Sequence, residues 1–223
     1  MQQCFLILGY GIPKDITLDE NYGIYLKTVF NNVFEACTKS NNWDATIIFS
    51  GGKTDMVKPY RRSEAQEMIK YFKLLMRRTS VRDRVKRWHL IPEKRSYSTL
   101  DNFLYTKEIL KPLKADTRNV IVFGEKTRHR RIIALTKKTL PGAKIMIVDF
   151  DQSANRYLDP DFLRHKESEV MKFDLWALKS PNNLKKHREL FKQKFVFLRQ
   201  AGPEKHVQAV KEWWEEELKK IVR

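Results

Sequence analysis

Five short runs of apolar residues recur along the first 150 residues of the chain. Val, Ile, Leu and Phe dominate them, and they cover residues 4–8, 45–49, 88–91, 120–123 and 144–148. A continuous apolar run of four or five residues is typical of a strand that is buried on both faces. The pattern therefore predicts about five buried strands.

Between these runs, apolar residues recur at the spacing of an amphipathic helix. Residues 64–78 are the clearest case, because Ala65, Met68, Phe72 and Leu75 fall on one helical face. The other helices predicted in these gaps are 22–38, 100–110 and 130–140. Alternating strands and helices predict an α/β fold, in which right-handed crossovers build a central parallel sheet with helices on both faces.

The alternation stops near residue 150, and the remaining chain is predicted to be helical. The predicted helices cover residues 167–179, 182–199 and 204–222, and Gly202-Pro203 is a stop signal before the last one. We expect one α/β domain over 1–150 and a C-terminal helical extension, 151–223, that packs on it. The apolar stripe of the last helix favours docking on the core or oligomerisation, and leaves binding of another partner open.

Composition and charge narrow the classes of function. Among 223 residues, 42% are hydrophobic, enough for a core, and the longest apolar runs are far too short to cross a membrane. Two cysteines make no disulfide framework, so we expect a cytoplasmic protein. The net charge is +17; residues 1–60 carry −1 and residues 61–223 carry +18. A basic surface attracts polyanions or phosphorylated small molecules, but solvated basic faces explain the same charge.

Polar and charged residues follow the first four predicted strands. Ligands of an open parallel sheet bind beyond the carboxyl ends of its strands, so these residues are the candidate site. They are Gly9, Tyr10, Gly11 and Lys14 after the first strand; Ser50, Gly51, Gly52, Ser63 and Glu64 after the second; Glu93, Ser96, Ser98, Thr99 and Asn102 after the third; and Glu125, Lys126, Thr127, Arg128, His129, Arg130 and Arg131 after the fourth.

This set of residues suits an anionic ligand that is rich in oxygen. Glycines allow backbone N–H groups to approach a phosphate closely, and a helix N-terminus adds positive potential. Hydroxyl groups donate hydrogen bonds, and arginines bind phosphate or carboxylate with two parallel bonds. Glu64 and Glu93 are the candidates for general acid–base catalysis.

Each segment also has a purely structural interpretation. The glycines after the first two strands serve equally well in tight turns. Ser63 is a suitable N-cap, and Glu64 suits the first turn of a helix because of the helix dipole. Ser98 or Thr99 caps a helix equally well, and residues 128–131 would make a solvated basic face. Their shared position at strand ends favours the functional interpretation.

Familiar motifs are incomplete. Gly52-Lys53-Thr54 ends like a P-loop, but the glycine required five residues earlier is Ile47. Gly9-Tyr10-Gly11 begins like a dinucleotide-binding fingerprint, but Lys14 occupies the third glycine position. The five histidines lack metal-ligand spacing, so no metal site is predicted. Binding of a divalent cation is nevertheless left open, and its candidate ligands are Asp15, Asp55, Glu64 and Glu93.

Five of these segments, in this order, resemble the YdcF-like (SanA/ElyC-type) family. They are Ile7-Leu8-Gly9-Tyr10-Gly11, Ser50-Gly51-Gly52, Ser63-Glu64-Ala65, the stretch from Glu93 to Asn102, and the basic cluster after the fourth strand. The resemblance covers about residues 3–150. It implies a Rossmann-like three-layer α/β/α sandwich and a cleft of charged and hydroxyl residues that is suspected of enzymatic work. Many members are anchored in membranes, and this sequence shows no such anchor.

These observations lead to three hypotheses. The first is a soluble enzyme, a hydrolase or group transferase, that acts on a phosphate-bearing small molecule such as a nucleotide or another phosphoester. The second is a module that binds a nucleotide or S-adenosylmethionine for sensing, without turnover. The third is a nucleic-acid-binding protein that uses its basic region, although no zinc-finger or RNA-recognition signature is present.

Overall fold

The computed structural model of the chain describes residues 3–150 and 160–221. Five strands form one sheet in the order β3-β2-β1-β4-β5, and all neighbouring strands are parallel. The strands are β1 (Gln3–Leu8), β2 (Ala45–Ser50), β3 (His89–Glu93), β4 (Val120–Glu125) and β5 (Lys144–Val148). The predicted α/β fold with a parallel sheet of five strands is confirmed.

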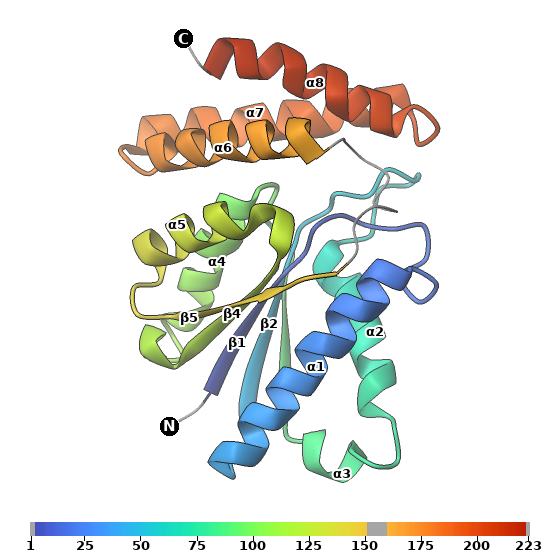
Figure 1. Ribbon diagram of the computed structural model, residues 1–223, viewed down its shortest axis with the longest axis vertical. Helices are drawn as coiled ribbons and strands as arrows, with labels where there is room; N and C mark the ends of the chain where they lie inside the picture. The colour runs from blue at the N-terminus through green and yellow to red at the C-terminus, as the bar shows by residue number, and fades with distance from the viewer. Residues whose placement is uncertain (1–2, 151–159, 222–223) are drawn as a thin grey trace.

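Helices cover both faces of this sheet, which makes the three layers of a Rossmann-like sandwich (Figure 1). One face packs against α1 (Glu20–Ser40) and α2 (Glu64–Met76), and the short α3 (Arg82–Val85) follows α2. The other face packs against α4 (Thr99–Leu110) and α5 (His129–Thr139). The two 3-10 turns are η1 (Thr117–Asn119) and η2 (Lys126–Arg128).

Strand β1 has no polar face, as its continuous apolar run predicted. In β1, Phe5 and Ile7 point into the core beneath α1 and α2, whereas Leu6 and Leu8 point into the core beneath α4 and α5. All four side chains are fully buried. Alternate residues of a strand face opposite ways, so a strand between two helical layers needs apolar residues at every position.

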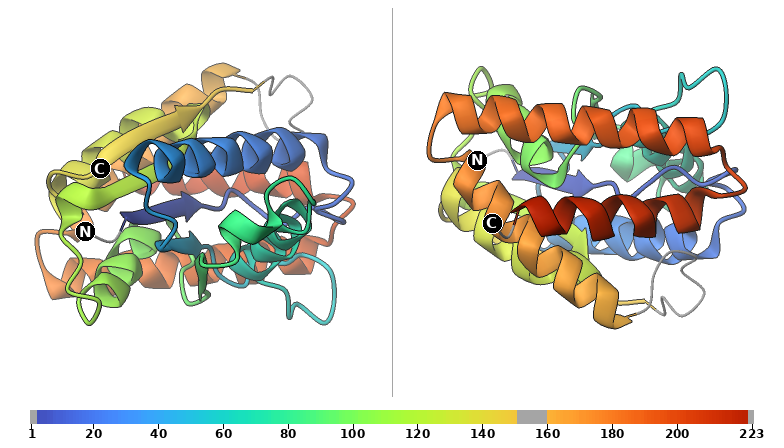
Figure 2. Two further views of the ribbon diagram at one scale, coloured as in Figure 1. Left: turned by 90° about the horizontal axis from the view of Figure 1, so that it is seen from below. Right: turned by 90° about the horizontal axis from the view of Figure 1, so that it is seen from above.

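The last three helices lie across the carboxyl ends of the strands (Figure 1). They are α6 (Pro160–Ala177), α7 (Pro181–Ala201) and α8 (His206–Ile221). Seen from above in Figure 2, they form a layer over that end of the sheet. A separate apolar cluster that includes Val170, Phe191, Leu198 and Trp214 holds them together. We call this layer the roof.

The boundaries differ from the predicted ones in a few places. Helix α6 begins at Pro160, seven residues before the predicted start; proline is tolerated in a first helical turn because its missing N–H has no partner there. The predicted domain boundary adjoins residues 151–159, which lie outside the described residues, as does Val222 of the last predicted helix. None of the helices in the described part of the chain combines the length and hydropathy that crossing a bilayer takes.

Candidate functional site

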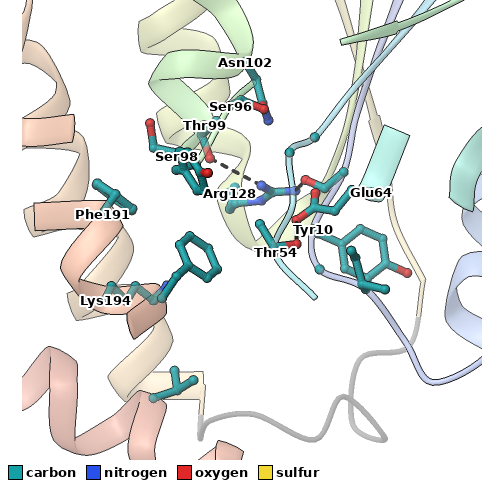
Figure 3. A pocket seen from close by; sticks show the side chains of 18 of the residues that line it. Tyr10, Thr54, Glu64, Ser96, Ser98, Thr99, Asn102, Arg128, Phe191 and Lys194 are labelled. Carbon is teal, nitrogen blue, oxygen red and sulfur yellow. Dashed lines mark hydrogen bonds between the residues drawn. The ribbon is translucent and has the colours of Figure 1, made fainter. Parts of the chain in front are cut away.

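A cavity of about 240 Å³ lies between the carboxyl ends of the strands and the roof. Its floor consists of the segments that follow β1, β2, β3 and β4, and its opposite wall comes from α6, α7 and α8. Figure 3 shows side chains of the floor and of the opposite wall pointing toward a common space. Four segments that are far apart in the sequence therefore meet at one site.

Fourteen of the predicted site residues line this cavity. They are Gly9, Tyr10, Gly11, Gly51, Gly52, Glu64, Ser96, Ser98, Thr99, Asn102, Glu125, Thr127, Arg128 and Arg131.

Glu93 and Ser50 lie beneath the floor, outside the lining. The Glu93 carboxylate accepts hydrogen bonds from Ser50 Oγ at 2.7 Å, from the Arg95 N–H at 2.6 Å and from the Ser96 N–H at 3.2 Å. These bonds satisfy a carboxylate that is only 2% exposed. Glu93 therefore holds the segment after β3 in position, which leaves Glu64 as the predicted acid–base residue inside the cavity.

The other five predicted residues also lie outside the lining. Ser63 caps α2 and accepts a hydrogen bond from the Gln66 N–H, as its structural interpretation proposed. Lys14 and Arg130 are exposed. Lys126 forms an ion pair with Asp149. His129 Nδ1 lies 2.9 Å from the carbonyl oxygen of Lys126.

Glu64 is the first residue of α2, and its carboxyl group is buried in the cavity wall. Thr54 Oγ1 donates a hydrogen bond of 2.6 Å to Glu64 Oε1. Burial raises the pKa of Glu64 because it disfavours the charged form, although the bond from Thr54 and the charge of Arg128 act in the other direction. The group is thus a carboxyl that keeps its proton to higher pH than an exposed glutamate does.

Glycines at the floor provide the space that Glu64 occupies. A Cβ atom on Gly9 would lie 2.1 Å from Glu64 Oε2, and one on Gly51 would lie 2.4 Å from Glu64 Cβ. Gly52 is as tightly placed, since its Cβ would lie 1.7 Å from the backbone oxygen of Ser96. The structure thus gives these glycines a packing role, whereas the sequence analysis expected them to let backbone N–H groups approach a phosphate.

Arg128 connects three segments of the floor. Its guanidinium group donates to Glu125 Oε1 at 2.6 Å and to the Gly9 carbonyl oxygen at 3.0 Å. It also donates to Thr99 Oγ1 at 3.3 Å (Figure 3). Burial lowers the pKa of Arg128, but the carboxylates of Glu125, Glu167 and Glu64 together outweigh this effect, and the pKa is raised. The guanidinium therefore carries a permanent positive charge beside Glu64.

The N-terminus of α4 forms the third part of the floor. Ser98 caps this helix and accepts a 3.0 Å hydrogen bond from the Asp101 N–H. Ser96, which is 1% exposed, also lines the cavity, and its Oγ has no hydrogen-bond partner among the residues that the structure describes. A buried hydroxyl without a partner is costly, and a helix N-terminus attracts anions. The two features together suit a ligand oxygen.

The sequence analysis missed the roof side of the cavity entirely. The roof residues in the lining are Leu163, Lys166, Glu167, Phe191, Lys194, Phe195, Leu198, His206, Val210 and Trp214. One signal was available: Lys194 lies three residues after Phe191 and four before Leu198, so it interrupts the apolar stripe of α7. A lysine on an apolar helical face indicates a charge held near the core.

Ion pairs and a hydrogen bond to the backbone connect the roof to the α/β part. Arg131 Nε donates to Asp174 Oδ2 at 2.5 Å, and His187 Nε2 lies 2.8 Å from Asp174 Oδ1, so α5, α6 and α7 meet at one carboxylate. On the other side of α7, Arg188 Nε donates to Asp101 Oδ1 at 2.8 Å. Arg199 donates to the backbone oxygen of Lys53 at 2.7 Å. Arg131 therefore lines the cavity, but its ion pair with Asp174 gives it a structural role, in which it holds the roof against α5.

The carboxylates considered as cation ligands do not gather in one place. Asp55 forms an ion pair of 2.8 Å with Arg62. Asp15 accepts hydrogen bonds from Thr17, at 2.7 Å from the hydroxyl. Over 3–150 and 160–221, no three His, Cys, Asp or Glu side chains are grouped so that they could hold a metal ion.

The chain was also compared with known proteins. No protein-family model matches it, and no curated protein does so either, so its resemblance to the YdcF-like family stays a prediction.

Proposed function

We propose that the chain is an enzyme, a hydrolase or a group transferase, that binds a phosphate-bearing small molecule in the cavity beneath the roof. The observation that carries this proposal is one cavity that contains Glu64, with its raised pKa, the buried guanidinium of Arg128 and the unpartnered hydroxyl of Ser96. Membership of the YdcF-like family is proposed on the same segments.

In this proposal the phosphate lies at the N-terminus of α4. Ser96 and Thr99 donate hydrogen bonds to its oxygens, and the positive end of the helix adds to the attraction. Arg128 stabilises negative charge that develops as the phosphoester bond breaks. The rings of Phe191, Phe195 and Trp214 offer an apolar surface to the rest of the substrate.

Glu64 is the proposed acid–base residue. A carboxyl group whose pKa is raised holds a proton more readily than an exposed glutamate, which suits it to general acid–base catalysis. The bond from Thr54 holds its orientation. Glu64 would either take a proton from an attacking water or hydroxyl group, or give one to the leaving group.

The test begins with thermal-shift screening of nucleotides, sugar phosphates and S-adenosylmethionine, followed by product analysis on every compound that stabilises the chain. Glu64→Gln should lower turnover by about 10²–10⁴-fold and leave binding in place. The matched control is Glu67→Gln. Glu67 is also a glutamate in the first turn of α2 but lies outside the lining, so this variant should keep normal turnover.

The alternatives predict different results in the same experiment. Stabilisation without any product would favour a sensing module. Binding of polynucleotides alone, with a steep loss of affinity in salt, would favour a nucleic-acid-binding protein and contradict the proposal. Unchanged turnover in Glu64→Gln would remove Glu64 from the mechanism.

A further inference from the structure

Among the described residues 3–150 and 160–221, Lys194 lines the cavity without a carboxylate partner. It belongs to α7, and Figure 3 shows its side chain across the cavity from Arg128 and Glu64. Aromatic rings surround it: its Nζ lies 5.0 Å from the ring centre of Trp214, 5.6 Å from that of Phe195 and 5.9 Å from that of Phe191.

The arginines and the other lysine that line the cavity each have a carboxylate partner. Arg128 pairs with Glu125 at 2.6 Å, and Arg131 pairs with Asp174 at 2.5 Å. Lys166 pairs with Glu167 at 2.8 Å. For Lys194, the part of the chain that the structure describes contains neither an ion pair nor a hydrogen bond, only the ring contacts.

Such an arrangement is unfavourable without a ligand. Lys194 is partly buried. An ammonium group withdrawn from water costs free energy unless it is paired, and aromatic faces compensate only part of this cost. An anion in the cavity would supply the missing partner. The cavity has room for one, since Lys194 and the floor line the same space.

We propose that Lys194 is the cation that binds the anionic group of the ligand. The inference rests on the proposed function and extends it: the phosphate would lie between α7 and the N-terminus of α4, with a cation from the roof on one side and Ser96 and Arg128 on the other.

The electrostatics of the cavity agree with this role. Burial, together with the charges of Lys166 and Arg131, lowers the pKa of Lys194 to about 7, while Glu167 and Glu64 act in the opposite direction. Besides Lys194, the charged and titratable groups that line the cavity are Tyr10 after β1, Glu64 of α2, Tyr97 after β3, Glu125 of β4, Arg128 of η2, Arg131 of α5, Lys166 and Glu167 of α6, and His206 of α8. A bound anion would raise the pKa of Lys194, so binding above neutral pH must draw a proton from the buffer.

Calorimetry with inorganic sulfate tests this directly, because sulfate keeps both charges around neutral pH and cannot itself supply the proton change. Titrations at about pH 7.5 in two buffers of different ionisation enthalpy should show uptake of about three quarters of a proton by the wild-type chain, because about that share of Lys194 side chains is neutral at this pH. Between about pH 7 and pH 9, the affinity should fall about fiftyfold, because only the protonated form binds.

Three variants separate the role of Lys194 from other causes. Lys194→Met should weaken sulfate binding at least about tenfold near pH 7 and abolish the proton uptake, because one charge–charge contact is lost. Lys194→Arg keeps a permanent charge, so it should bind sulfate without proton uptake; any pH dependence left in it comes from other groups such as Glu64. Lys192→Met is the matched control, since Lys192 is an exposed residue of α7 outside the lining.

The results distinguish failure of this inference from failure of the proposed function. If the wild type and Lys194→Met bind sulfate equally, or if the wild type takes up no proton, the role of Lys194 is wrong while an anion site remains. If neither sulfate nor any phosphate ester binds, both proposals are wrong. A variant that fails to fold is replaced by NMR of lysine ¹³Cε signals in the wild type, where one lysine should titrate near pH 7 and shift to higher pH with sulfate.

Discussion

At the scale of single residues, Glu64 connects the packing of the floor to its chemistry. Its side chain packs so closely against Gly9 and Gly51 that a Cβ atom at either position would overlap it. Thr54 donates a hydrogen bond to its Oε1 atom. The same close packing removes water and raises its pKa. One buried side chain thus accounts for two of the glycines that were predicted to contact phosphate directly.

The raised pKa of Glu64 predicts how stability changes with pH. The folded chain holds this proton more tightly than the unfolded chain, so Glu64 stabilises the fold below its ordinary pKa of 4.5, and this contribution is lost as pH rises through the folded-state pKa. Glutamine does not titrate, so Glu64→Gln lacks this difference in pKa between the folded and unfolded chain. The free energy of unfolding of this variant, relative to wild type, should therefore increase from acid to neutral pH in urea titrations. A constant difference across this range would contradict the raised pKa.

Gly52 allows a sharper test of the floor. Because a Cβ there would overlap the Ser96 backbone oxygen, Gly52→Ala must push the segments after β2 and β3 apart. Overpacking of this kind costs about 1–3 kcal/mol, measurable by urea unfolding, and Ser96 would move away from the ligand, so sulfate affinity should fall as well. Wild-type stability in this variant would show that the two segments are not in close contact.

At the scale of elements, the contribution of the α4 N-terminus to anion binding can be measured by comparing two helix caps, one beside the cavity and one outside its lining. Ser98 caps α4 beside the cavity and Ser180 caps α7 outside the lining, each accepting from the N–H three residues later, at 3.0 and 3.1 Å. Ser98→Ala and Ser180→Ala should each cost about 1 kcal/mol of unfolding free energy. Calorimetry should find weaker sulfate binding only in Ser98→Ala. Equal affinity in both variants would place the anion elsewhere.

The elements themselves were largely predictable from the sequence, since both of their signals are local. Continuous apolar runs identified all five strands, and strand β5 has the predicted bounds, 144–148. Helical spacing identified the seven long helices of the described residues, but not the four-residue α3, which has too few positions to show a period. Helix α6 begins earlier than predicted because residues 160–166 carry mostly polar side chains and lack an apolar stripe.

At the scale of the whole molecule, the position of the roof could not be predicted. The rule that parallel strands deliver their ends to one edge placed the segments after β1, β2, β3 and β4 together. No comparable rule says where a helical extension docks, because that depends on contacts between residues far apart in the chain. Arg131, predicted as a phosphate ligand, proved to be one of these contacts through Asp174. Lys194 was missed for the same reason.

The contact at Asp174 predicts that the roof and the site depend on one another. Asp174 is fully buried and serves both Arg131 and His187, so Asp174→Asn leaves the Arg131 charge without its closest partner. Loss of one member of a buried ion pair costs about 3–5 kcal/mol, and the roof should separate from the sheet edge and weaken sulfate binding.

The control lies on the same helix. Asp161 also pairs with an arginine, Arg164, but both side chains are exposed, so Asp161→Asn should leave unfolding and affinity nearly unchanged. Urea unfolding and sulfate calorimetry on both variants decide the matter. If Asp174→Asn loses stability but binds sulfate as the wild type does, the roof is only a structural extension, and the anion is held by the floor alone.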